Sequence, residues 1–224
     1  MDSNGLVVVL DCDGVILDAN EMKTEAFAAV LSAYPQPVVA DFLSYQRGAF
    51  GRSRFKLLGD FFDRFLRQPV TEATMTNLLD DFGRICVREY LRVPMTESAE
   101  EFLRQASPLH RLYVASGSKQ EELRLVFEQR RLRAYFKDVL GSPTPKTELL
   151  ADIVAREAGR RAVFVGDAHA DWDAAQANGV EFVFMGKYSN ERAELSARAR
   201  AAHVPVIECL SELLPLLGAL HSSR

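Results

Sequence analysis

The sequence has few cysteines, no long apolar run and no excess of basic residues. Its three cysteines, Cys12, Cys86 and Cys209, are widely separated and include no Cys-x-x-Cys pair. This argues against a disulfide framework or a zinc site and favours a reducing compartment. No apolar stretch approaches the roughly 20 residues of a membrane-spanning helix. The formal net charge is −4, so the chain lacks the basic surface expected of a nucleic-acid-binding protein.

The N-terminus also lacks the features of a secretory signal. It is acidic and leads at once into an apolar run, whereas a signal peptide begins with positive charge. We therefore expect a cytoplasmic protein whose partner is a small molecule rather than nucleic acid or a membrane. The sequence leaves open whether the protein is a monomer or a homodimer.

Short apolar runs alternate along the chain with stretches of helical spacing. Hydrophobic residues make up 48% of the 224 residues, enough for a sizeable buried core. The strand-like runs are 6–11, 111–116, 137–142, 162–167, 181–186 and 204–209. The helical stretches are 97–107, 119–131, 146–158, 170–178, 189–201 and 211–218. Because the runs are apolar at consecutive positions, they predict an α/β fold with a doubly wound, Rossmann-like parallel sheet covered on both faces.

Residues 19–92 interrupt this alternation, since they show amphipathic helical patterns and no convincing strand. The helical patterns cover 21–34, 53–67 and 74–91. The second of them carries an apolar stripe of Phe55, Leu58, Phe62 and Phe65 or Leu66. We expect 19–92 to form an inserted all-helical cap over the carboxyl end of the first strand. Residues 1–18 and 93–224 would form the Rossmann-like core.

Polar side chains stand where the predicted strands end or where the following helices begin. They are Asp11, Asp13, Ser116, Lys146, Asp167 and Asp171. Each alone has an ordinary structural explanation, such as a helix cap, a Ser–Gly turn or a solvated lysine. Together they gather at the carboxyl edge of the sheet, where open parallel sheets bind their ligands.

The first strand delivers two carboxylates, Asp11 and Asp13, to one place, and the next basic residue along the chain is Lys23. Like charges this close require a cation or a shared proton. Carboxylate oxygens favour Mg²⁺, which keeps several waters and commonly binds a substrate phosphate. The pattern therefore predicts a magnesium site that receives a phosphate ester.

The same residues predict how the phosphate would be bound and transferred. Backbone N–H groups near Gly14 and Gly117, the hydroxyl of Ser116 and the charge of Lys146 can hold phosphate oxygens. Asp11 can attack phosphorus and form an aspartyl phosphate. Asp13 can protonate the leaving oxygen and later deprotonate the attacking water.

Four segments stand in the order of the motifs of the haloacid dehalogenase-like superfamily. They are "DCDGVILD", "ASGS", "PTPKTELL" and "VGDAHADWDAAQANGV". The chain resembles the phosphatase branch with a helical cap, which includes phosphoglycolate phosphatases and β-phosphoglucomutases. The resemblance implies that Asp11 is the nucleophile and Asp13 the acid/base, with Ser116 and Lys146 as phosphate binders.

The resemblance also implies the ligands of the metal. Asp11 and Asp167 would bind Mg²⁺ through their side chains, and Asp13 through its backbone carbonyl. The acid at Asp171 would bind the metal or anchor the lysine. Family members that act on haloacids or phosphonates lack a carboxylate at the position of Asp13, so its presence favours phosphate esters. With Asp13 present, we expect Lys23 to be a solvated helix-face lysine rather than an imine-forming one.

The expected function is a Mg²⁺-dependent phosphatase acting on a small phosphorylated metabolite, such as a sugar phosphate or a phosphoglycolate-like acid. A β-phosphoglucomutase-like mutase would use the same residues and is the alternative. A receiver-type signalling domain and a silent binding module fit the insert and the motif set less well. Within the cap, Arg52 is the candidate substrate contact, while Arg54 and Lys56 are compatible with the solvated face of a helix.

Overall fold

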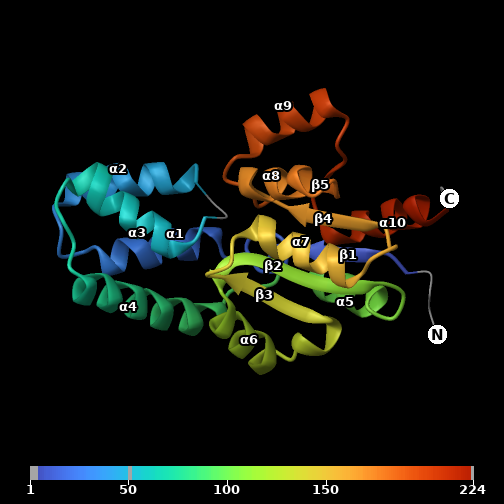
Figure 1. Ribbon diagram of the computed structural model, residues 1–224, viewed down its shortest axis with the longest axis horizontal. Helices are drawn as coiled ribbons and strands as arrows, with labels where there is room; N and C mark the ends of the chain where they lie inside the picture. Colours follow the sequence, from blue (N-terminus) through green and yellow to red (C-terminus); the bar gives the residue numbers. More distant parts are fainter. Residues whose placement is uncertain (1–4, 50–51, 223–224) are drawn as a thin grey trace.

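The structure is a computed structural model that describes residues 5–49 and 52–222. The ends of the predicted core and residues 50–51 of the predicted cap lie outside the described residues. Within the described part, six strands form one parallel sheet in the order β3-β2-β1-β4-β5-β6 (Figure 1). The strands are β1 (Val7–Leu10), β2 (Arg111–Lys119), β3 (Asp138–Ser142), β4 (Ala162–Gly166), β5 (Glu181–Met185) and β6 (Val206–Ile207).

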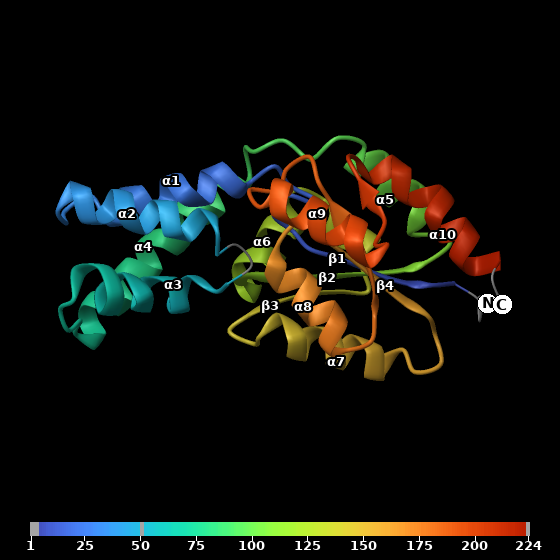
Figure 2. The ribbon, with the colours of Figure 1, turned by 90° about the horizontal axis from the view of Figure 1, so that it is seen from above.

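Helices cover both faces of the sheet, as the consecutive apolar positions predict. Side chains of β1 alternate between two buried clusters: Val8 and Leu10 pack with α5, α6 and α10, and Val7 and Val9 pack with α7, α8 and α9. Figure 2 shows α5 and α10 on one face of the sheet and α7 and α8 on the other. The doubly wound α/β fold is therefore confirmed. These helices are α5 (Ala99–Ala106), α6 (Gln120–Gln129), α7 (Lys146–Arg156), α8 (His169–Ala177), α9 (Arg192–Ala202) and α10 (Leu213–Ser222).

The strand register brings the predicted site residues to one edge. Leu10 of β1 lies beside Val114 of β2 and Val165 of β4. Because the strands are parallel, the residues that follow these three positions emerge at the same edge of the sheet. β2 differs from the prediction, since it runs on to Lys119 with an irregular register after Ala115.

The remaining helices form a second lobe beyond the carboxyl ends of the strands (Figure 1). They are α1 (Asn20–Val30), α2 (Gln36–Arg47), α3 (Arg54–Asp60), a π-helix (Phe61–Leu66) and α4 (Glu72–Tyr90). An aromatic cluster fills the lobe, with rings of Phe27 and Phe82 4.4 Å apart and rings of Phe42 and Phe61 5.3 Å apart. The described residues of 19–92 contain no strand. The predicted division into core and cap stays a prediction.

Two details of the lobe differ from the sequence prediction. Helix α2 was not predicted, although Pro37 in its first turn suits a helix start. Phe55 is 62% exposed and does not belong to the apolar stripe. The inward face of α3 instead begins at Arg54 and continues through Leu57 and Leu58. No helix among the described residues has both the length and the apolar character that a membrane span needs.

Candidate active site

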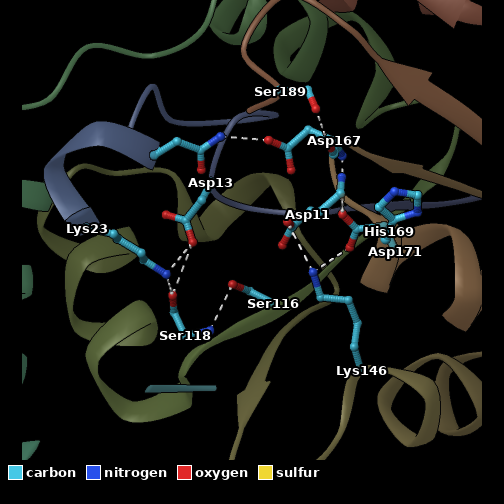
Figure 3. A network of polar contacts seen from close by, with 12 residues as sticks. Asp11, Asp13, Lys23, Ser116, Ser118, Lys146, Asp167, His169, Asp171 and Ser189 are labelled. Atoms are coloured by element: carbon cyan, nitrogen blue, oxygen red, sulfur yellow. Dashed lines mark hydrogen bonds and ion pairs between the residues drawn. The ribbon is translucent and has the colours of Figure 1, made fainter. Parts of the chain in front are cut away.

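Three buried aspartates form the centre of the site. Asp11 follows β1, Asp167 follows β4, and Asp171 lies in the first turn of α8 (Figure 3). One carboxylate oxygen from each lies within 4.8 Å of the others. The sequence placed these residues at one edge of the sheet, and the structure adds that Asp11 and Asp167 follow strands that are neighbours in it.

Lys146, the first residue of α7, provides positive charge to this cluster. Its Nζ lies 3.1 Å from Oδ2 of Asp11 and also bonds Oδ1 of Asp171. Oδ2 of Asp171 accepts the backbone N–H groups of Asp167 and Ala168, at 3.2 and 3.1 Å. Asp171 is thus fully bonded within the chain, which fits the lysine-anchoring role; a role as metal ligand stays a prediction.

The other two acids are less well compensated. Burial and then the charge of Asp171 raise the pKa of Asp11 to about 7, although Lys146 opposes this shift. Burial and the charge of Asp11 raise the pKa of Asp167 well above its ordinary value, and the Nδ2 of Asn20 donates to Asp167 at 2.7 Å. Oδ1 of Asp11 is buried and finds no hydrogen-bond partner among the described residues.

This donor set fits a divalent cation. Hard oxygen ligands, a buried carboxylate oxygen without a partner and an excess of acids over nearby cations are what Mg²⁺ would stabilise. Gly14 contributes by its size, because a Cβ there would overlap Oδ2 of Asp167. Its φ of +74° also lies in the region that favours glycine.

Asp13 has a separate environment. Its Oδ1 accepts a hydrogen bond from the hydroxyl of Tyr90 at 2.6 Å. Its Oδ2 lies 2.6 Å from Nζ of Lys23 and accepts from the hydroxyl of Ser118 at 3.2 Å. The carboxylate is not part of the cluster of Asp11 and its two neighbouring acids. Asp13 therefore stands apart from the three clustered acids and has its own set of hydrogen-bond donors.

The expectation that Lys23 is a solvated surface lysine is wrong. Its side chain is only 15% exposed, pairs with Asp13 and bonds Ser118 (Figure 3). The reason is its place in the first turn of α1, where the lobe joins the core and the helix surface faces the sheet edge. Sequence reasoning also missed Asn20, Tyr90 and Ser118. Ser118 could have been suspected from its place in "SGS", but no local pattern singles out Tyr90.

The predicted phosphate binders lie beside the acids. Ser116 is buried in the irregular part of β2, where its hydroxyl accepts the N–H of Ser118 at 3.1 Å. Figure 3 shows Ser116 between Ser118 and Lys146. Gly117 lines the cavity described below. The contacts of these residues with phosphate stay a prediction.

A small cavity of about 30 Å³ lies between the acids and the helical lobe. Its lining consists of Asp11, Asp13, Gly117, Ser118 and Asp167 from the core and Asn20, Lys23, Phe27, Gln46, Arg52, Arg54, Leu57 and Phe82 from the lobe. The lobe wall is therefore partly aromatic and partly cationic.

The two arginines of this wall are held differently. Arg52 pairs with Asp60 at 2.9 Å and donates to the hydroxyl of Tyr45. Arg54 is only 8% exposed, because it makes a two-pronged ion pair with Glu122 of α6, at 2.9 and 2.5 Å. The solvated-face explanation for Arg54 is wrong, since this pair joins the lobe to the core.

Comparisons with known proteins agree with the motifs. The family model of the haloacid dehalogenase-like hydrolases matches residues 6–179. No curated protein matches the chain significantly. A phosphonoacetaldehyde hydrolase-like protein from Oleispira antarctica has a similar structure, with a TM-score of 0.77 and 12% identity. That match covers 98% of this chain and 93% of the other.

Two further solved structures are similar over almost their whole lengths. A predicted phosphoglycolate phosphatase from Haemophilus somnus has a TM-score of 0.72 and 14% identity, covering 96% of this chain and 99% of the other. The HAD-type hydrolase YfnB from Bacillus subtilis, described as bound to magnesium, has a TM-score of 0.69 and 17% identity, covering 96% and 100%. At such identities these structures show the fold, while the family model covers most of the chain. The chain belongs to the haloacid dehalogenase-like hydrolase family.

Proposed function

We propose that the protein is a Mg²⁺-dependent phosphatase that hydrolyses a small phosphorylated metabolite through an aspartyl phosphate on Asp11. The observation that carries the proposal is the state of the Asp11 carboxylate. Oδ2 is fixed by Lys146, Oδ1 is buried and unbonded within the described chain, and Asp11 is one of the residues that line the cavity. A carboxylate fixed in this way beside the cavity is suited to attack a bound phosphorus atom.

The reaction would proceed in two steps. In the first, an Asp11 oxygen bonds to phosphorus, the bond from phosphorus to the leaving oxygen breaks, and Asp13 gives that oxygen its proton. In the second, a water molecule gives a proton to Asp13 and bonds to phosphorus, and the bond from phosphorus to Asp11 breaks. Inorganic phosphate leaves, and both aspartates return to their starting states.

The roles of the surrounding residues follow from their charges. Lys146, Ser116 and the backbone N–H of Gly117 would bind phosphate oxygens. Asp11, Asp167 and the backbone carbonyl of Asp13 would hold Mg²⁺, with Asp171 as a further ligand or as the anchor of Lys146. When bound, the cation neutralises charge on Asp11 and on the phosphoryl oxygens.

An imine-forming lysine, which would suit a phosphonate substrate, is disfavoured. Burial lowers the pKa of Lys23, but the charge of Asp13 outweighs it and leaves the pKa above its ordinary value. A lysine needs a neutral amine to attack a carbonyl group. Lys23 is instead paired with the acid/base carboxylate. We therefore propose a phosphate ester as substrate, either a sugar phosphate or a phosphoglycolate-like acid.

A phosphate-release screen over phosphorylated metabolites tests the proposal. Wild-type protein should release phosphate steadily in Mg²⁺ and not in EDTA, and Asp11→Asn should release none above background. Asp173→Asn is the matched control, because it makes the same substitution at an exposed aspartate of α8 that does not line the cavity. Turnover by the Asp11→Asn protein would refute the covalent mechanism. Interconversion of phosphosugars without steady phosphate release would favour the mutase.

A further inference from the structure

We propose that Tyr90 is a positioning residue that, together with Lys23, aims the carboxylate of Asp13 at the leaving oxygen of the substrate. This inference rests on the proposed function, because it concerns the residue that we propose as acid/base. Tyr90 lies 77 residues from Asp13 in the sequence and outside the four motifs.

The first observation is the completeness of the bonding around Asp13. Tyr90 bonds Oδ1 at 2.6 Å, while Lys23 and Ser118 bond Oδ2 at 2.6 and 3.2 Å. Figure 3 shows Lys23 and Ser118 converging on the carboxylate from one side. A rotation of the carboxylate about its side-chain bonds would break these contacts. The group is therefore held in one orientation beside the cavity that it lines.

The second observation is that Tyr90 itself is fixed. It is fully buried and is the last residue of α4, where the lobe returns to the core. Arg130, which follows α6, donates to the backbone carbonyls of Tyr90 and Val93 at 2.7 and 2.9 Å. Lys23 enters from α1, the helix at the other junction of the lobe. Asp13 is thus held from both junctions at once.

The third observation is that the contacts on the two carboxylate oxygens are joined. The hydroxyls of Tyr90 and Ser118 are 2.9 Å apart, and either can be the donor. Tyr90 on Oδ1 and Ser118 on Oδ2 therefore belong to one hydrogen-bonded network, which also includes Lys23 through its bond to Ser118.

A comparison within the chain separates positioning from simple stabilisation. Tyr113 is also a buried tyrosine whose hydroxyl donates to a carboxylate, that of Glu157, at 2.5 Å. It lies on β2 three residues before Ser116, and it is not among the residues that line the cavity. Tyr113→Phe therefore removes a bond of the same kind away from the proposed chemistry.

The test measures single-turnover phosphorylation of the enzyme by substituted phenyl phosphates, from p-nitrophenyl to p-methoxyphenyl phosphate. A p-nitrophenolate leaves without a proton, whereas a less acidic phenol needs one from Asp13. Tyr90→Phe and Lys23→Met should slow release of p-methoxyphenol about tenfold or more and that of p-nitrophenol less than about twofold. Tyr113→Phe should leave the dependence on the leaving group as in the wild type.

The outcomes separate this inference from the proposed function. If Tyr90→Phe slows all leaving groups equally or none of them, the positioning role is wrong. If Tyr90→Phe does not fold, Ser118→Ala must show the same selective loss, or the inference is overturned. If wild-type protein forms no phosphoenzyme, or the Asp11→Asn variant still does, the proposed function fails and this inference fails with it.

Discussion

Nζ of Lys146 lies 3.1 Å from Oδ2 of Asp11, and the same nitrogen bonds Asp171. A buried ammonium group therefore faces two of the three clustered acids. Burial lowers the pKa of Lys146, but the charges of Asp11 and Asp171 outweigh it, so the lysine stays protonated. The charge that would bind phosphate also stabilises the site before any substrate arrives.

Lys146→Met should consequently destabilise the fold as well as remove activity. It would leave buried carboxylates without their counter-ion, and breaking a buried ion pair from one side costs about 3–5 kcal/mol. Urea unfolding at neutral pH in EDTA measures the loss. Lys187→Met is the control, because Lys187 pairs with Glu97 at the surface and should change the midpoint little. Equal midpoints for the two variants would contradict a counter-ion role.

Without Mg²⁺, the protein should lose stability as the pH rises. The pKa of Asp11 is about 7 in the folded chain, against an ordinary value of 3.8. Between these pH values the folded state binds more protons than the unfolded state. The contribution of Asp11 to the free energy of unfolding is therefore largest below pH 4 and is lost as the pH rises to about 7. The melting temperature in EDTA should fall across this range, and Asp11→Asn should make the fall smaller, with the raised pKa of Asp167 accounting for what remains.

Mg²⁺ should reverse that loss. A ligand that binds only the folded state at about 100 times its Kd adds about 2.7 kcal/mol. The melting temperature at pH 8 should therefore rise with added Mg²⁺, and Asp167→Asn should abolish the rise. A rise that survives in this variant would place the cation elsewhere.

Gly14→Ala should damage the metal site more than the fold. Its Cβ would overlap Oδ2 of Asp167, and its φ of +74° adds backbone strain. Gly179→Ala is matched in strain, with a φ of +62°, but has open space around the new Cβ. Both variants should lose roughly 1–2 kcal/mol through strain, and only Gly14→Ala should lose the Mg²⁺-dependent rise in melting temperature. An unchanged rise would show that Asp167 can move aside.

The sequence predicted the parts of the site that depend on local pattern. An apolar run that ends in a carboxylate predicts both a buried strand and the place of its last side chain, as for Asp11 and Asp167. Lys23 and Tyr90 could not be predicted in this way, because their contacts with Asp13 depend on how the helical lobe packs against the sheet. The prediction that Phe55 is part of the apolar stripe was wrong for a related reason. The buried position at the start of that helix is taken by Arg54, whose partner Glu122 lies 68 residues further along the chain.

Arg52 provides the test of substrate contact in the lobe. It lines the cavity, and its present partners, Asp60 and Tyr45, lie on the lobe itself. If it binds the part of the substrate beyond the phosphate, Arg52→Ala should raise KM about tenfold on the best metabolite from the screen and change kcat less than about threefold. Arg64→Ala is a close control, because Arg64 also bonds the Tyr45 hydroxyl, at 2.8 Å, but is not part of the cavity lining. An equal rise in KM for both variants would assign the effect to Tyr45, and no rise for Arg52→Ala would remove Arg52 from the substrate site.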